Sequence, residues 1–71
     1  MLNNIAEFMV LCLRQFAKEK KLDPIDAYNY LAKYKGIEFL EQHYEIEHTL
    51  GFHEIIDDLV KVCRREGGSL I

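Results

Sequence analysis

The sequence has little of several features on which common kinds of chemistry depend. Its only serine, Ser69, lies close to the end of the chain, so no serine nucleophile stands beside a base. Its four glycines, at positions 36, 51, 67 and 68, are spaced as helix boundaries and form no phosphate-binding loop. Without such a nucleophile or a cofactor motif in 71 residues, we expect no catalytic residues, no cofactor and no enzyme activity.

Cysteine is also scarce, and the two cysteines are far apart in the sequence. Cys12 and Cys63 form no CxxC pair of the kind that binds zinc or performs redox chemistry. Each lies on an apolar helical stripe, so we expect two small buried side chains in a reducing compartment. A disulfide between the first and last helices is the alternative. On its buried stripe, the thiol of Cys63 should have a raised pKa, which argues against a nucleophile paired with histidine.

Positive charge is in the minority, with 9 Lys and Arg against 12 Asp and Glu and a net charge of -3. A basic surface is the usual feature of nucleic-acid binding, so this balance argues against a nucleic-acid partner. Long apolar runs are missing as well. The stretch IAEFMVLCL is interrupted by Glu7 and follows no basic residue, which fits neither a secretory signal nor a membrane span. We therefore expect a cytoplasmic protein without membrane contact.

The composition and periodicity are those of a folded helical domain. Hydrophobic residues make up 49% and charged residues 30% of the chain, whose length suits one small domain. Apolar residues recur at spacings of three and four, and no strand pattern is found. We predict an all-α, four-helix bundle-like single domain over residues 1–71. Its helices are expected at about 3–21, 24–35, 37–46 and 52–66, with a tail over 67–71.

Several residues mark the predicted helix boundaries. Asp23 is expected to be an N-cap, and Pro24 suits the first helical position. Gly36 is expected to close the same helix in the left-handed conformation. Asn3 or Asn4 is expected to cap the first helix. The buried side of the second helix is predicted to consist of Ala27, Tyr28 and Leu31.

The first and last helices each carry an apolar stripe. In the first helix it comprises Leu2, Ile5, Met9, Cys12, Leu13 and Phe16. In the last helix it comprises Phe52, Ile55, Ile56, Leu59, Val60 and Cys63. Phe8 and Leu11 are candidates for an interface, and the tail is expected to be either loose or folded back through Leu70 and Ile71.

Between Gly36 and Val60 the chain has seven acidic residues and no lysine or arginine. Such asymmetry describes either one solvated face or an acidic surface that docks on a basic partner. The candidate docking residues are Glu38, Glu41, Glu45, Glu47, Asp57 and Asp58. Tyr30 and Tyr34 on the second helix form a second candidate surface, because tyrosine is enriched at interfaces.

All three histidines, at positions 43, 48 and 53, lie in this acidic window. Glu45 and His48 have the Glu-x-x-His spacing of di-iron bundles, but those sites need two such elements and the chain offers one. Metal binding is therefore the weakest alternative, and we assign no metal ligands. A helix-turn-helix around Gly36 would place several glutamates against phosphates, so DNA binding through it is not expected.

The segments YLAKYKGI and FLEQHYEIEHTLGFHEIIDDL resemble a family of short bacterial proteins, the domain-of-unknown-function family three-seven-nine-one. Tyr44, His48, Thr49 and the stretch 55–59 match its arrangement, and the similarity extends from the region of Phe8 onward. Members of that family often lie beside genes for ADP-ribosyltransferase-like proteins. The resemblance therefore implies a non-catalytic, antitoxin-like or stabilising partner of such a protein.

A motif that recurs where no catalytic set can be assembled is expected to have a structural use. Thr49 or His48 is predicted either to cap the final helix or to tie its start to the preceding turn, with Tyr44 and Leu50 packing this corner. We therefore expect a non-catalytic protein–protein interaction module that docks through its acidic third and fourth helices. The alternative is a homo-oligomeric structural module in which a second copy covers Phe8, Leu11 and the tyrosines. A small metal-binding protein is the third possibility.

Overall fold

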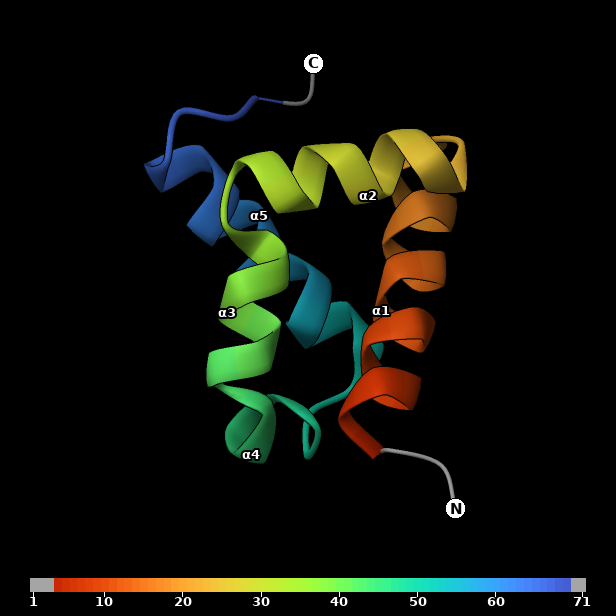
Figure 1. Cartoon of the computed structure of the whole chain (residues 1–71), viewed down its shortest axis with the longest axis vertical. Helices are drawn as coiled ribbons and strands as arrows, with labels where there is room; N and C mark the ends of the chain where they lie inside the picture. The colour runs from red at the N-terminus through yellow and green to blue at the C-terminus, as the bar shows by residue number, and fades with distance from the viewer. Residues whose placement is uncertain (1–3, 70–71) are drawn as a thin grey trace.

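The computed structural model describes residues 4–69 (Figure 1). They form five helices: α1 (Asn4–Lys20), α2 (Pro24–Lys33), α3 (Gly36–Gln42), α4 (Tyr44–Glu47) and α5 (Phe52–Arg65). The all-α prediction is confirmed for this part of the chain, in which no strand occurs. The predictions for Leu2 in the first stripe, for a cap at Asn3 or the Asn4 side chain, and for Leu70 and Ile71 fall outside the described residues.

The prediction of four helices was wrong, because the third predicted helix is divided in two. His43 has φ -113° and ψ 24°, which ends α3 and begins α4. No proline or glycine marks this break in the sequence. The helices also do not run side by side as in a regular bundle. In Figure 1, α2 crosses the ends of α1 and α3, while α5 contacts both α1 and α3.

The core is built from the facing sides of α1, α2, α3 and α5. The apolar side chains with less than a tenth of their area exposed are Cys12, Phe16, Ala17, Ala27, Leu31, Leu40, Ile55, Ile56, Leu59, Val62 and Cys63. The two predicted apolar stripes thus supply most of the core. Phe52, which was predicted to lie on the last stripe, is instead 39% exposed at the first position of α5.

The start of α2 follows the sequence prediction. The carboxylate of Asp23 accepts a hydrogen bond from the backbone N–H of Ile25 over 3.0 Å, and Pro24 is the first helical residue. This cap satisfies one of the backbone donors left free at a helix N-terminus. None of the described helices is long and apolar enough to cross a membrane.

The end of α2 differs from the prediction. Lys35, with φ 68°, adopts the left-handed conformation, whereas Gly36 is the first residue of α3 and is buried. The reason for glycine at position 36 is space. A Cβ atom there would lie 2.7 Å from Cδ2 of Leu31 and 3.3 Å from Sγ of Cys63. The missing side chain lets the start of α3 pack directly on α2 and α5.

Candidate functional site

The predicted corner lies between α4 and α5, and its side chains bond backward into α4. Nδ1 of His48 donates a hydrogen bond to the Tyr44 carbonyl oxygen over 2.8 Å. The hydroxyl of Thr49 donates to the Ile46 carbonyl oxygen over 2.7 Å. Both carbonyls also accept a backbone N–H, from His48 over 2.9 Å and from Thr49 over 3.1 Å, so the two side chains add second bonds at the end of a helix of only four residues.

Ring contacts attach the same corner to the first helix. The rings of Tyr44 and His48 are stacked with centroids 4.5 Å apart, and Phe8 of α1 meets Tyr44 edge-on at 5.3 Å. Leu50 packs against the core. Each of the four predicted corner residues, Tyr44, His48, Thr49 and Leu50, thus has a contact within the chain.

Neither His48 nor Thr49 caps α5. The N-cap of that helix is Gly51, whose backbone N–H donates a hydrogen bond to Oε1 of Glu54 over 3.1 Å. Glu54 is the third residue of the helix, so its side chain reaches back across the first turn. Two side-chain hydrogen bonds thus stabilise the link between α4 and α5. Thr49 bonds back to Ile46 of α4, and Glu54 of α5 bonds back to Gly51.

The predicted acidic surface is only partly a surface. Glu38, Glu41 and Glu45 on α3 and α4 are exposed, as is Asp57 on α5, but these residues are distributed over three helices. Two of them also have partners within the chain. Glu38 lies 4.0 Å from Nζ of Lys35, and Asp57 lies 3.7 Å from Nε2 of His53. Exposed pairs of this kind contribute little to stability.

Glu47 is not a surface residue at all, and its assignment to a docking face was wrong. It is 5% exposed, and its Oε1 atom has no hydrogen-bond partner among residues 4–69. Asp58, on α5, is half-buried beside it and hydrogen-bonds its side chain. A signal for this existed in the sequence, because Glu47 continues the three- and four-residue spacing of Ile37, Leu40 and Tyr44. The sequence analysis grouped Glu47 with the other acidic residues by charge and did not use this spacing.

The environment of Glu47 shifts two pKa values. Burial, together with the hydrogen bond and charge of Asp58, raises the pKa of Glu47 to about 7. Burial, with a smaller effect of the Glu47 charge, raises the pKa of Cys12 to about 12. Burial also raises the pKa of Cys63 to about 11. Both cysteines are free and buried, which confirms their prediction as buried thiols and argues against nucleophilic chemistry.

No group of three or more His, Cys, Asp or Glu side chains is arranged to hold a metal ion within residues 4–69. The ring of His48, which the sequence paired with Glu45, instead uses Nδ1 to bond the Tyr44 carbonyl. The described residues therefore offer no assembled cation site.

Tyr30 of α2 and Tyr34, the residue that follows its last turn, face inward. Tyr30 stacks on Phe16 with ring centroids 6.0 Å apart, and it lies 5.0 Å from the ring of Tyr34. Gly68 packs against both rings, since a Cβ atom there would lie 2.7 Å from Tyr34 and 3.0 Å from the Tyr30 hydroxyl. Tyr30 and Tyr34 thus cover the segment after α5 and are only half-exposed.

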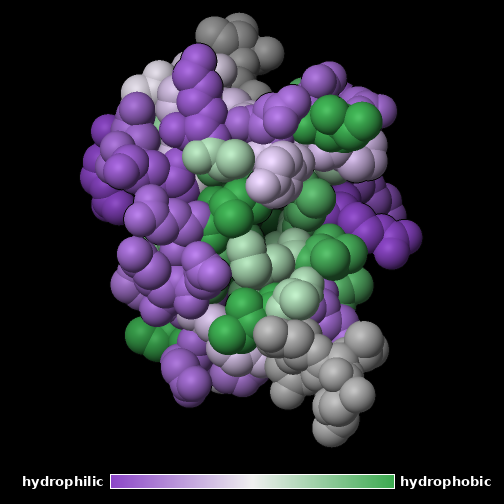
Figure 2. All heavy atoms as spheres, viewed as in Figure 1, coloured by the Kyte–Doolittle hydropathy of each residue, from purple (hydrophilic) through white to green (hydrophobic). Residues whose placement is uncertain are grey.

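Tyr28 is the tyrosine that faces outward, and its predicted burial was wrong. It is 49% exposed and lines an apolar hollow of about 120 Å³ at the junction of α1, α2 and α3. The lining residues, which define the apolar hollow from here on, are Met9, Val10, Leu13, Tyr28 and Ile37. Figure 2 shows apolar residues gathered between α1 and α3 below α2, with hydrophilic residues around them.

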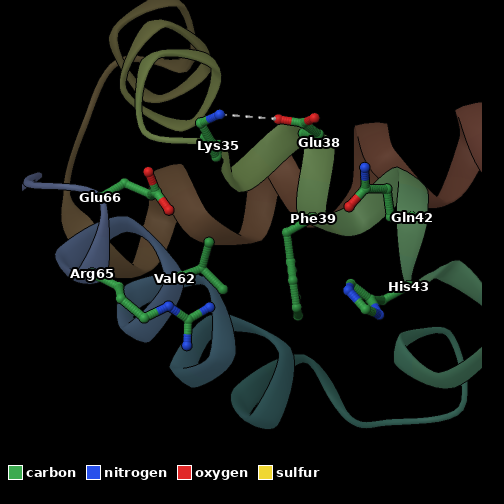
Figure 3. A pocket seen from close by; sticks show the side chains of 8 residues that line it. All are labelled: Lys35, Glu38, Phe39, Gln42, His43, Val62, Arg65 and Glu66. Atoms are coloured by element: carbon green, nitrogen blue, oxygen red, sulfur yellow. Dashed lines mark ion pairs between the residues drawn. The ribbon is translucent and has the colours of Figure 1, made fainter.

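A second hollow, of about 210 Å³, lies between α3 and the end of α5 (Figure 3). Its lining is Lys35, Glu38, Phe39, Gln42, His43, Val62, Arg65 and Glu66. Figure 3 shows the ring of Phe39 pointing between the two helices and the Lys35–Glu38 pair at the rim. The charges are mixed in sign, so this groove has no single preference for an anion or a cation.

The fold and these surfaces define a small all-α domain. Residues 7–66 match the family described as "Protein of unknown function (DUF3791)", and the chain belongs to that family. No curated protein and no solved structure matches the chain.

Proposed function

We propose that this chain is a non-catalytic protein–protein interaction module whose docking surface is the apolar hollow. The observation that carries the proposal is the exposure of Val10 and Tyr28, which are 53% and 49% exposed around a depression lined only by apolar and aromatic side chains. Single exposed apolar residues are ordinary, whereas an apolar depression formed jointly by three helices supports a role in binding.

The chemistry of the hollow supports a protein partner. Tyrosine brings a large rigid ring to an interface at little cost in side-chain entropy, and Met9 adapts its shape to what is bound. The hollow is too small for most cofactors, which occupy pockets of about 300–1,000 Å³. It does suit one or two apolar side chains presented by another protein.

The role suggested by the family resemblance is one form of this function. An antitoxin-like or stabilising partner of an ADP-ribosyltransferase-like protein would bury the apolar hollow against that protein. The exposed glutamates of α3 and α4, Glu38, Glu41 and Glu45, would then steer a basic partner surface toward it.

The test is photo-crosslinking in the organism that encodes the chain. A photoreactive amino acid replaces Val10 in the hollow or, as the matched control, Ile46, an apolar residue of α4 that is 64% exposed. A discrete adduct from position 10 that is absent from position 46 supports the proposal. The mass of the adduct distinguishes a second copy of the chain from an ADP-ribosyltransferase-like or other protein. No adduct from position 10, or the same products from both positions, would contradict it.

A further inference from the structure

Two unpaired charges of opposite sign flank the apolar hollow. Arg14 lies four residues after Val10 on α1, and Glu41 lies four residues after Ile37 on α3, so each charge is one helical turn beyond a lining residue. Both side chains are exposed. Neither forms an ion pair with another residue in the described range 4–69.

The directions of the two helices place these charges at opposite ends of the hollow. The colours of Figure 1 show α1 rising toward α2 and α3 descending from α2 toward α4. Arg14, one turn after Val10, therefore lies nearer α2, and Glu41, one turn after Ile37, lies nearer α4. The surface consists of an apolar centre with a cation at one end and an anion at the other.

A surface of this kind is complementary to itself. Rotation by a half-turn about an axis across the centre superposes the apolar part of one copy on that of the other. The same rotation brings each cation against the anion of the opposite copy, so one contact is formed twice. A foreign partner would need its own matching pair of charges at the same separation, whereas a second copy has it by symmetry.

From this arrangement we propose that a second copy of the chain occupies the apolar hollow, in a two-fold dimer in which Arg14 of each copy faces Glu41 of the other. This inference rests on the proposed function and names its partner. The apolar centre supplies the affinity and the two charge pairs set the register, because exposed pairs contribute more to specificity than to affinity.

The size of the molecule is compatible with such a dimer. A standard interface takes about 800 Å² from each partner. The chain exposes 5021 Å², so an interface of that size would cover roughly a sixth of its surface. The face shown in Figure 2 has its largest group of apolar residues at its centre, where a dimer of this kind would be joined.

The test is charge exchange followed by analytical ultracentrifugation. The wild-type chain should sediment as a dimer of the 8.4 kDa protomer and dissociate on dilution. Arg14→Glu and Glu41→Arg each create two like-charge contacts and should weaken the dimer at least about tenfold. An equimolar mixture of the two variants restores both opposite-charge pairs in the mixed dimer. It should therefore recover the wild-type affinity, as should the double variant. Lys61→Glu, a charge reversal at an exposed position of α5, is the control and should leave the affinity unchanged.

Recovery in the mixture is the decisive result, since a general loss of folding or a change in net charge would not produce it. A chain that remains monomeric up to millimolar concentration overturns the inference, as does a dimer indifferent to both exchanges. The crosslinking experiment tests the proposed function independently of the dimer. If the wild type is monomeric but position 10 crosslinks to a different protein, the hollow is a docking site with another occupant. If position 10 gives no adduct, both proposals fail.

Discussion

The carboxyl group of Asp58 on α5 interacts with that of Glu47 on α4, at a site where Glu47 is only 5% exposed, and its hydrogen bond and charge add to the burial that raises the pKa of Glu47. Two carboxyls can form such a bond only when one of them holds a proton. Oε1 of Glu47 has no partner within the described part of the chain, so an ionised Glu47 would be poorly solvated at this position. Burial is the main cause that raises the pKa of this group, to about 7.

This pair makes stability depend on pH. The unfolded chain releases the Glu47 proton around pH 4.5, whereas the folded chain keeps it up to about pH 7. Because the folded state binds more protons in that interval, the free energy of unfolding should fall as the pH rises through it and level off above. At about 1.4 kcal/mol for each pKa unit, the contribution of this one group is at most about 3 kcal/mol. Urea denaturation at a series of pH values between these limits measures it.

Glu47→Gln isolates the contribution, because the amide resembles the protonated carboxyl. We expect this variant to lose most of the slope and to be more stable than the wild type at pH 8. Glu45→Gln is the matched control, since Glu45 is exposed on the same short helix and should keep the wild-type profile. A Glu47→Gln variant with an unchanged slope would show that another group carries the pH dependence.

Removal of the Thr49 hydroxyl should loosen the link between α4 and α5. Thr49→Ala loses the 2.7 Å hydrogen bond to the Ile46 carbonyl and should lower the free energy of unfolding by about 1 kcal/mol. Thr49→Ser keeps the hydroxyl and should remain close to the wild type. Chemical denaturation of the three proteins is sufficient. Equal stability of the alanine variant and the wild type, combined with loss of a binding activity, would assign Thr49 to an interface instead.

Substitution should lower the free energy of unfolding at Gly36 and leave it unchanged or slightly higher at Gly51. In Gly36→Ala, the new Cβ would lie 2.7 Å from Leu31, whose side chain is fully buried, so we expect a loss of about 1–3 kcal/mol. In Gly51→Ser, the space is open and the backbone is already extended, with φ -75° and ψ 159°. Serine is a preferred N-cap, so this variant should be unchanged or gain a few tenths of a kcal/mol. Thermal denaturation compares the two, and a Gly36→Ala variant as stable as the wild type would contradict the packing argument.

The two thiols should be inert while the chain is folded. Cys12 and Cys63 are fully buried, and burial raises their pKa values to about 12 and about 11. Alkylation by iodoacetamide at pH 8 should therefore be at least about 100-fold slower than in the chain unfolded by guanidinium. Mass spectrometry after timed quenching gives both rates. Rapid modification of one cysteine in the native chain would show that its helix opens locally.

Local signals in the sequence were sufficient where the interaction is itself local. The N-cap of α2 depends on Asp23 and its neighbours two residues away, so the Asp23–Pro24 pair predicted it. The break at His43 has no such local cause. Neither proline nor glycine is present at the break. The break lies between α3 and the segment that leads to α5, which packs against α1 and α3.

The candidate surface was predicted less well than the fold. Leu11 was recognised as a candidate for an interface, but Tyr28 was assigned to the core and Glu47 to the surface. The spacing of Glu47 agreed with burial, and its charge argued against it. The second carboxyl that helps to raise the pKa of Glu47 belongs to Asp58, which is brought there from eleven residues further along the chain.

The sequence by itself determined the helical class, the start of α2 and the burial of both cysteines, because propensity, capping and apolar periodicity act over one or two helical turns. The tertiary structure alone decided that α2 crosses α1 and α3, and with that crossing which residues remain outside. Tyr30 and Tyr34 are half-covered by the segment around Gly68, whereas Tyr28 is left at the junction of three helices. The reason is geometric: a helix has several faces that could be buried, and only the positions of its neighbours select one.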